Sequence, residues 1–291
     1  MDKLLKPNRD ALEEYFNERT VSDNTRKNYI YMFVRIQEQL RTKLKIPHIL
    51  KNIHTLLILL DEQYVLAKEN NFAREVGLKP VISAMFLKIL LQMIKNKIDY
   101  GRVIDAIEVY DKRQIDYTAS KTKSQLEESG VSYDKLTNAL KDKQINEIDY
   151  VLLFLLIKFG VRNTDLSYVY LQEQSQEENH MFIEDKSVVY VRNKYKLKKT
   201  FGTITVKITD EKFVSIIENM IESGKQFLFM NRKNATYTTQ TMGHYIKQQT
   251  KRIFGIGLTE SVIHKTIINH YKVTGNDQAL IDYNTTRPHH F

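Results

Sequence analysis

The sequence predicts a mainly α-helical protein of two domains, with one small antiparallel β-sheet or hairpin in the second domain. Only four prolines and ten glycines interrupt the 291 residues, which leaves room for long helices. Apolar residues follow helical spacing over most of the chain, but they alternate with polar residues between positions 182 and 208, as in strands. A polar stretch at residues 118–131 separates the purely helical part from the mixed part.

The composition is that of an ordinary globular chain, with 42% hydrophobic and 27% charged residues. A net charge of +9 and a pI near 9.3 favour a polyanionic partner. The same charge is also expected of a lysine-rich chain from an AT-rich genome. The absence of cysteine excludes disulfides, a thiol nucleophile and a zinc–thiolate site.

The first residues, Met1–Pro7, lack the apolar core of a signal peptide. The longest apolar runs, such as Val151–Ile157, are too short to cross a bilayer. We therefore expect a soluble intracellular protein without a membrane partner.

The first domain is predicted to span residues 1–117 and to consist of helices. A break at Val21–Thr25 divides a helical pattern that runs from Arg9 to Leu40, and Ser22 or Asp23 can cap the second of its two helices. Three further helices are predicted over residues 48–68, 81–97 and 102–117. Residues 118–131 are the predicted interdomain linker.

The second domain is predicted to span residues 132–291. Helices are expected over residues 132–141, 145–158, 210–222, 239–254 and 260–271, the one at 239 being capped by Thr239. Strands are expected over residues 182–195 and 200–208, with a basic hairpin tip at Lys194–Lys199 between them.

One segment of the second domain carries the first functional signal. Gly160 ends an apolar helix, Arg162 follows at the bend, and Asp165 and Leu166 begin the next helical turn. An arginine held at such a bend in a basic chain is well placed to bind a phosphate.

Taken in order, these pieces resemble the tyrosine recombinase (lambda-integrase-like) family. Gly160-Val-Arg162-Asn-Thr-Asp165-Leu166 is similar to the family's Gly-[Leu/Val]-Arg-x-x-[Glu/Asp]-Leu motif, and Ser22-Asp-Asn-Thr25-Arg-Lys-Asn-Tyr29 to its Ser-x-x-Thr-x-x-x-Tyr pattern. The resemblance implies a helical core-binding domain with a SAM-like fold, followed by a catalytic domain. It also implies that Arg162 binds the scissile phosphate.

The family's catalytic lysine lies on a β-hairpin after an apolar strand, and Lys194 occupies that place after Val189–Val191. Its role would be to protonate the departing 5′-oxygen of DNA. Lys196, Lys198 and Lys199 are close enough to be alternatives to Lys194. The segment could also be a solvated basic turn without a catalytic role.

The family's second motif, His-x-x-Arg-[His/Lys], is similar to Ser261-Val-Ile-His264-Lys265, with His270 downstream. His264 stands where the second phosphate-binding arginine is expected. A histidine lacks the bidentate, always charged fork of a guanidinium but still donates one hydrogen bond. This substitution puts full catalytic power in doubt.

The family's nucleophile is a tyrosine near the carboxy terminus. No tyrosine follows Tyr283, and Phe291 occupies the position where the nucleophile is expected. Tyr271 and Tyr283 lie too close to His264 in the sequence to replace it. Two interpretations remain open: phenylalanine replaces the nucleophile, which predicts binding without cleavage, or the true tyrosine lies beyond Phe291.

The resemblance implies site-specific recombination or integration through a 3′-phosphotyrosyl intermediate, with no metal or nucleotide cofactor. The implied partner is double-stranded DNA, bound by a homotetramer in the cytoplasm, nucleoid or nucleus. Phosphate contacts are expected from both domains. The candidates for these contacts are Arg26, Lys27, Arg35, Lys95, Lys97, Lys196, Lys198, Lys247, Lys251, Arg252 and Lys265.

Three other functions compete with this one. A type IB topoisomerase shares the catalytic fold, although the separate helical first domain favours a recombinase. A non-catalytic DNA-binding or architectural protein descended from recombinases is favoured by His264, Ser261 and the missing tyrosine. An unrelated helical DNA-binding regulator would leave Arg162 and the basic hairpin unexplained.

Overall fold

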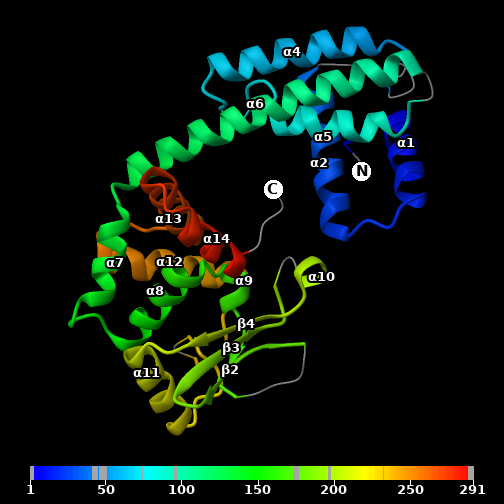
Figure 1. The fold of residues 1–291 in the computed structure, drawn as a ribbon. Helices are drawn as coiled ribbons and strands as arrows, with labels where there is room; N and C mark the ends of the chain where they lie inside the picture. The colour runs from blue at the N-terminus through cyan, green and yellow to red at the C-terminus, as the bar shows by residue number, and fades with distance from the viewer. Residues whose placement is uncertain are drawn as a thin grey trace. The chain divides into compact units, whose positions relative to one another are not determined.

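The computed structural model describes residues 3–40, 45, 51–73, 75–94, 97–172, 177–195, 198–231 and 233–287. The chain forms two compact units, Met1–Lys121 (unit 1) and Thr122–Phe291 (unit 2). Figure 1 colours them from blue to green and from green to red. No helix in the described residues is long and apolar enough to span a membrane.

Every regular element in the described residues of unit 1 is a helix. Its helices are α1 (Lys6–Asn17), α2 (Asp23–Gln39), α4 (Ile53–Glu69), α5 (Pro80–Leu91) and the first part of α6 (Lys97–Ser129). Ser22 caps α2, as predicted, because its side chain accepts a hydrogen bond of 3.2 Å from the Thr25 amide. Buried apolar side chains from every helix form the core, with the Phe33 and Phe86 rings in edge contact at 5.0 Å.

Most of the predicted linker, residues 118–131, is part of the helix α6. We expected a helix to end at Tyr117 and a linker to fill residues 118–131, but α6 continues to Ser129. The stretch is polar, yet it contains no proline or glycine before Gly130, so nothing in it stops a helix. Gly130, with φ +56°, ends it.

Unit 2 is built around α8, whose residues Tyr150–Ile157 are all buried. The helices of this unit are α7 (Tyr133–Lys141), α8 (Glu147–Phe159), α9 (Asn163–Leu166), α10 (Lys198–Phe201), α11 (Glu211–Glu222), α12 (Thr239–Phe254), α13 (Glu260–Thr274) and α14 (Asp277–Thr286). Thr238 caps α12 in place of the predicted Thr239. The sequence patterns did not predict α14.

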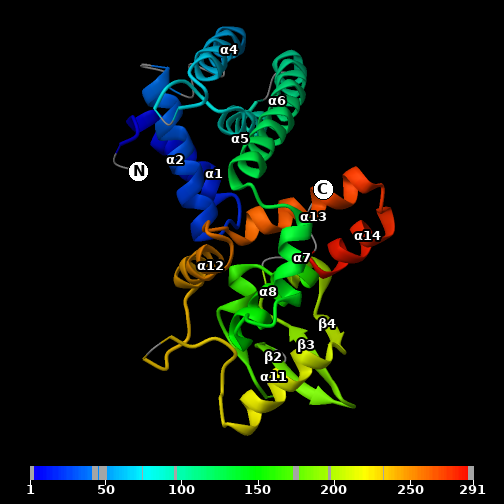
Figure 2. The same ribbon diagram turned by 90° about the vertical axis from the view of Figure 1, so that its left-hand side faces the viewer.

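The sheet of unit 2 has four strands in the order β1 (Val169–Tyr170), β2 (Asn179–Glu184), β3 (Ser187–Arg192) and β4 (Ile204–Ile208). It is mixed and not antiparallel throughout, because β1 pairs with β2 in parallel. The single strand predicted over residues 182–195 is a hairpin that turns at Asp185 and Lys186, both with positive φ. The helix α11 packs against β3, as Figure 2 shows.

Candidate functional site

Arg162 stands at a tightly fixed bend between α8 and α9. Gly160 ends α8 with φ +54°, and a Cβ atom there would lie 2.8 Å from the Tyr283 hydroxyl oxygen. The position therefore requires glycine for both its backbone conformation and its close contact. Two residues later, the Arg162 amide donates a hydrogen bond of 3.0 Å to Asp165 Oδ2. This cap fixes the backbone that carries the Arg162 side chain.

Asp165 also forms a fully buried ion pair with Arg192 of β3. Arg192 Nη2 lies 2.5 Å from Asp165 Oδ2, and both side chains have no exposed surface. Arg192 Nη1 donates to the backbone carbonyl of Thr286 at the end of α14. The Tyr190 hydroxyl donates to the carbonyl of Asp165 over 3.1 Å. One arginine thus connects α9, β3 and α14 directly behind Arg162.

Arg287, just past α14, brings a second arginine to the same place. Its side chain is 7% exposed, with Nη1 donating to the Gly160 carbonyl at 2.8 Å and Nη2 lying 3.4 Å from Glu260 Oε1. Burial lowers the pKa of the Arg287 guanidinium, and the neighbouring charge of Arg162 lowers it further. Arg287 therefore contacts the backbone two residues before Arg162.

Glu260 connects the second motif to the first. Its Oε2 accepts a hydrogen bond of 3.1 Å from the amide of Asn163, the residue after Arg162. Asn163 Nδ2 in turn donates to the Thr239 carbonyl in the first turn of α12, over 3.0 Å. The beginnings of α9, α12 and α13 therefore meet at Asn163.

Lys194 follows β3 and is linked to the first motif through Asn179. The Asn179 amide nitrogen donates to the carbonyls of Asp165 (3.1 Å) and Lys194 (3.0 Å), and its oxygen accepts from the Lys194 amide at 2.7 Å. The Lys194 side chain is 64% exposed, and its Nζ lies 3.0 Å from Glu178 Oε1. Its backbone is thus fixed while its ammonium group faces solvent.

His264 lies one turn after Glu260 on α13 and is half-buried. Its ring stacks on Tyr283 at 5.4 Å with an angle of 23° between the planes. Tyr283 is the residue that contacts Gly160, so the second motif packs against the end of α8 through this ring. Lys265, the next residue, donates from Nζ to Gln125 Oε1 at 3.0 Å.

This arrangement concentrates positive charge around Arg162. Four cationic side chains, Arg162, Arg192, Arg287 and Lys194, belong to this network. Three of them pair with a carboxylate: Arg192 with Asp165, Arg287 with Glu260 and Lys194 with Glu178. The network therefore carries one positive charge more than negative ones, and a guanidinium held at this bend can bind a phosphate oxygen.

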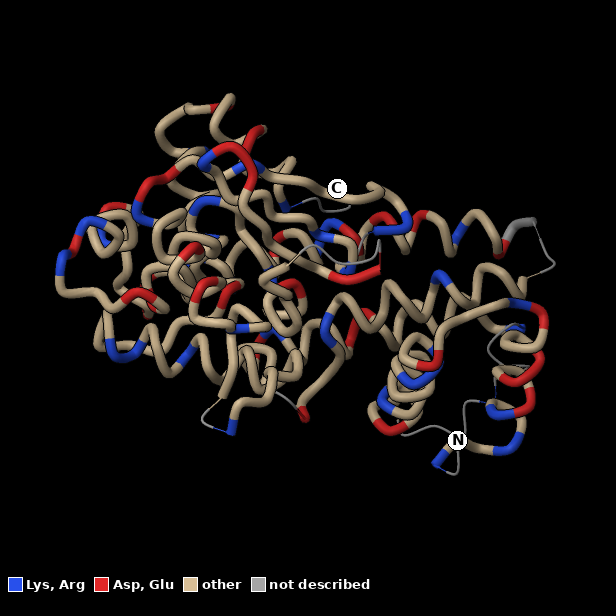
Figure 3. The backbone as a smooth tube through the Cα atoms, turned by 90° about the horizontal axis from the view of Figure 1, so that it is seen from below, with Lys and Arg blue, Asp and Glu red and all other residues tan. Residues whose placement is uncertain are grey.

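The other predicted DNA contacts are scattered, and several have partners within the protein. Arg35, Lys198, Lys265 and Arg252 lie near Glu38, Asn193, Gln125 and Asp149 respectively, and Arg35 is only 14% exposed. Lys27, Lys247 and Lys251 are exposed, as is Arg26, whose guanidinium lies 4.8 Å from the centre of the Phe16 ring. Figure 3 shows basic and acidic residues interspersed along the backbone of both units.

Four predicted positions lack a side-chain description. Lys95, Lys196 and Phe291 lie outside the described residues, and Lys97 begins α6 without a described side chain. The nucleophile position and its neighbours therefore stay predictions.

Sequence patterns missed four residues of this site: Arg192, Arg287, Glu260 and Asn179. Arg192 stands at an inward position of an alternating strand, which was the available signal for a buried charge that needs a partner. The other three are recognisable only from contacts across 14 to 127 positions of the sequence.

Comparisons with known proteins show that this chain is similar to solved structures. No family model and no curated protein matches the chain. The crystal structure of XerA recombinase matches 98% of this chain and 90% of its own, at 13% identity and a TM-score of 0.38. XerH site-specific recombinase, bound to its difH substrate before cleavage, matches 95% of this chain and 89% of its own, at 13% identity and a TM-score of 0.35. These values are too low to establish a family.

Proposed function

We propose that this protein binds double-stranded DNA and holds one phosphodiester at Arg162, in the manner of a tyrosine recombinase. The observation that carries the proposal is the contact of Arg287 with the Gly160 carbonyl, two residues before Arg162, beside the buried Arg192–Asp165 ion pair. The like charges of Arg162 and Arg287 repel each other, and a phosphate bound at Arg162 would counter this repulsion in the same direction as Glu260 does.

In the proposed reaction, Arg162 binds a non-bridging oxygen of the scissile phosphate, and the buried guanidinium of Arg287 adds positive charge beside it. A tyrosine hydroxyl attacks phosphorus and loses its proton to solvent, the bond to the 5′-oxygen breaks, and Lys194 gives that oxygen a proton. The 5′-hydroxyl of a second strand then attacks the phosphotyrosyl bond and releases the tyrosine. The phosphodiester energy is conserved, so the cycle needs no nucleotide.

Arg287 supplies the charge that His264 does not. Histidine at position 264 donates one hydrogen bond at most to the phosphate, whereas Arg287 approaches the same end of α8 from α14. A chain with Phe291 in the nucleophile position would bind DNA without cutting it, whereas a tyrosine beyond Phe291 would allow cleavage. We expect residues 1–117 and 132–291 to act as the core-binding and catalytic domains, and four copies to assemble on DNA.

The first experiment measures DNA binding at several salt concentrations. Arg162→Ala and Arg287→Ala are expected to weaken binding by about 1.5–3 kcal/mol each, the value of a charged hydrogen-bonded contact. Lys123→Ala is the matched control, because it removes the same charge from a side chain that is 79% exposed on α6. Equal losses in all three variants would mean that overall charge, and not this site, binds DNA.

The second experiment tests strand transfer. Phe291→Tyr and the unchanged protein are incubated with labelled nicked duplexes and four-way junctions, and a denaturing gel detects a covalent protein–DNA adduct. We expect an adduct with tyrosine only, and its loss in the Phe291→Tyr/Arg162→Ala double variant. Absence of any DNA binding would refute the proposal as a whole.

A second candidate function is favoured by the stacking of His264 on Tyr283, which occupies the ring in packing. In this second function, a recombinase-derived protein binds DNA without cleaving or joining strands. It predicts Arg162-dependent binding but no adduct from Phe291→Tyr, nor from Phe291→Tyr combined with His264→Arg.

A further inference from the structure

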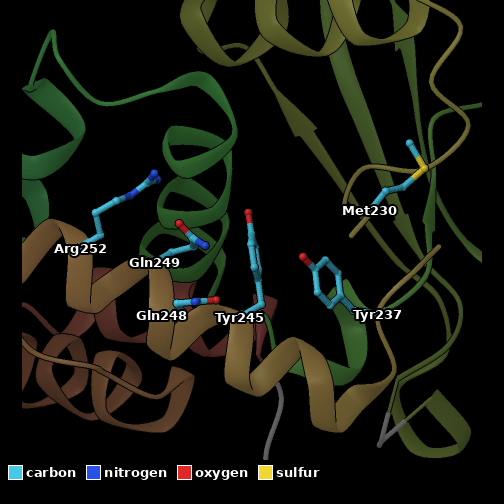
Figure 4. A pocket seen from close by; sticks show the side chains of 6 residues that line it. All are labelled: Met230, Tyr237, Tyr245, Gln248, Gln249 and Arg252. Atoms are coloured by element: carbon cyan, nitrogen blue, oxygen red, sulfur yellow. The ribbon is translucent and has the colours of Figure 1, made fainter. Parts of the chain in front are cut away.

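A cavity of about 420 Å³ lies on one face of α12, away from Arg162. It is lined by Met230, Tyr237, Tyr245, Gln248, Gln249 and Arg252. Figure 4 shows Tyr245, Gln249 and Arg252 extending from the same face of the helix, as their spacing of four and three residues requires. Cavities that bind small organic ligands have volumes of about 300–1,000 Å³, so this one is large enough.

Aromatic rings form one wall of the cavity. The rings of Tyr237 and Tyr245 stack at 4.8 Å with 28° between their planes. Burial raises the pKa of Tyr245 to about 12, with a smaller contribution from the neighbouring Tyr237. The Tyr245 hydroxyl is therefore protonated and uncharged at neutral pH. A neutral, half-buried ring of this kind stacks well on a flat heteroaromatic ligand.

Amide groups form the adjoining wall. The side-chain amides of Gln248 and Gln249 make no hydrogen bond to another residue that the structure describes, and both line the cavity. Each amide offers a donor and an acceptor side by side. This pair matches the neighbouring acceptor and donor on the edge of adenine, whereas guanine presents two acceptors there.

Arg252 adds a positive charge at the end of this wall. Its Nη2 pairs with Asp149, whose side chain is only 2% exposed, and this contact fixes the direction of the guanidinium. The Arg252 side chain is nevertheless 55% exposed, so further N–H groups remain available to an anion. Ring, amides and guanidinium thus follow one another along α12.

We propose that this cavity binds a nucleobase with its attached phosphate, adenine being preferred. The base stacks on Tyr245, its edge bonds to the amides of Gln248 and Gln249, and the phosphate contacts Arg252. The base can belong to a free nucleotide or to an unpaired position of a DNA strand. The inference does not rest on the proposed strand transfer, because Arg162, Arg287 and Lys194 do not line the cavity.

The test is calorimetric titration of the full chain with AMP, GMP, adenosine and ribose 5-phosphate. A second arm uses single-stranded thymidine oligonucleotides that contain one adenine or one abasic position. AMP is expected to bind about ten-fold more tightly than adenosine, which lacks the phosphate, and than ribose 5-phosphate, which lacks the base. The strand with one adenine is expected to exceed the strand with the abasic position by about the same factor. Tyr245→Ala and Gln249→Leu should each remove most of this preference, and Tyr100→Ala, an exposed tyrosine of unit 1, should not.

Two outcomes support the proposal and distinguish its sources. Binding of AMP that Tyr245→Ala abolishes identifies a free nucleotide, and an adenine preference found only in the oligonucleotides identifies a base of a strand. Failure of both ligands overturns it, as does binding that Gln249→Leu leaves unchanged. If thermal melting shows that Tyr245→Ala does not fold, Gln249→Leu is the variant that tests the proposal. Arg162→Ala should bind AMP normally. Loss of AMP binding in that variant would mean that AMP binds at Arg162 and would refute the proposal.

Discussion

The two motifs of the candidate site are held in place by different forces. The first, Gly160–Leu166, rests on an ion pair between Asp165 and Arg192 with no exposed surface. The second, Ser261–His270, combines buried apolar side chains with two stacked rings, His264 on Tyr283 and His270 on Tyr133. A buried ion pair requires both partners, whereas a stacked ring accepts any flat ring of similar size. The first motif therefore has little freedom to change, whereas position 264 can accept another flat ring without disturbing the fold.

The largest expected effect breaks the ion pair of the first motif. Arg192→Leu leaves Asp165 buried without its partner and should lower the free energy of unfolding by about 3–5 kcal/mol, measured by urea titration. Lys194→Leu, two residues along the same chain segment, removes an exposed ion pair with Glu178 and should cost about 1 kcal/mol or less.

A double variant separates charge from packing in this pair. Asp165→Leu/Arg192→Leu removes both charges, so it should be more stable than Arg192→Leu alone, although the cap of α9 is also lost. If the double variant is less stable than the single one, the ion pair is not the force that holds the first motif.

The next largest effect concerns the glycine that ends α8. Gly160→Ala combines a left-handed backbone with a Cβ atom 2.8 Å from the Tyr283 hydroxyl oxygen. It should cost about 1–3 kcal/mol in the same assay. Gly224→Ala is the control, because its φ is +75° and nothing lies within 4 Å of the added atom. Equal costs at the two glycines would mean that the contact with Tyr283 contributes nothing.

A smaller effect is expected in the second motif. His264→Ala removes the stacking on Tyr283 and should cost about 0.5–1.5 kcal/mol beyond the loss of buried area. His264→Phe keeps a ring in the same position and should recover most of that stability. A phenylalanine variant as unstable as the alanine variant would show that a hydrogen bond of the imidazole, and not its ring, holds the motif.

The smallest effect at neutral pH comes from two buried tyrosines, Tyr190 and Tyr283. It is the only effect that grows as the pH rises. Burial raises the pKa of the Tyr190 and Tyr283 hydroxyls above the usual value near 10. The unfolded chain loses these protons first as pH rises, so the stability they contribute is fully present below pH about 10 and falls above it. Tyr283→Phe should therefore reduce the fall in melting temperature above pH 10, and an unchanged fall would contradict this assignment.

Local patterns predicted most helices because their signals lie within one or two turns. The Ser22 cap and the helix-ending Gly160 were both predicted from neighbouring residues and are both observed. The errors occurred where local signals are ambiguous. The alternating pattern of residues 182–195 continues through a two-residue turn, and polar residues 118–129 are equally compatible with a linker and an exposed helix.

The candidate site was predictable only in part, for a related reason. Arg162, Lys194 and His264 could be selected from short motifs because each lies at a recognisable place along a helix or hairpin. Arg287 and Asn179 carry no such signal, since their importance comes from hydrogen bonds to residues far away in the sequence.

By itself, the sequence determined the helical character of the protein, its basic charge and the positions of the two motifs, because spacing, glycine placement and composition act locally or as sums over the chain. The tertiary structure alone decided which charges meet. Asp165 and Arg192 are 27 residues apart, and Arg287 and Gly160 are 127 residues apart, yet each pair is in contact. Burial makes these contacts strong, and burial is a property of the folded chain and not of any segment within it.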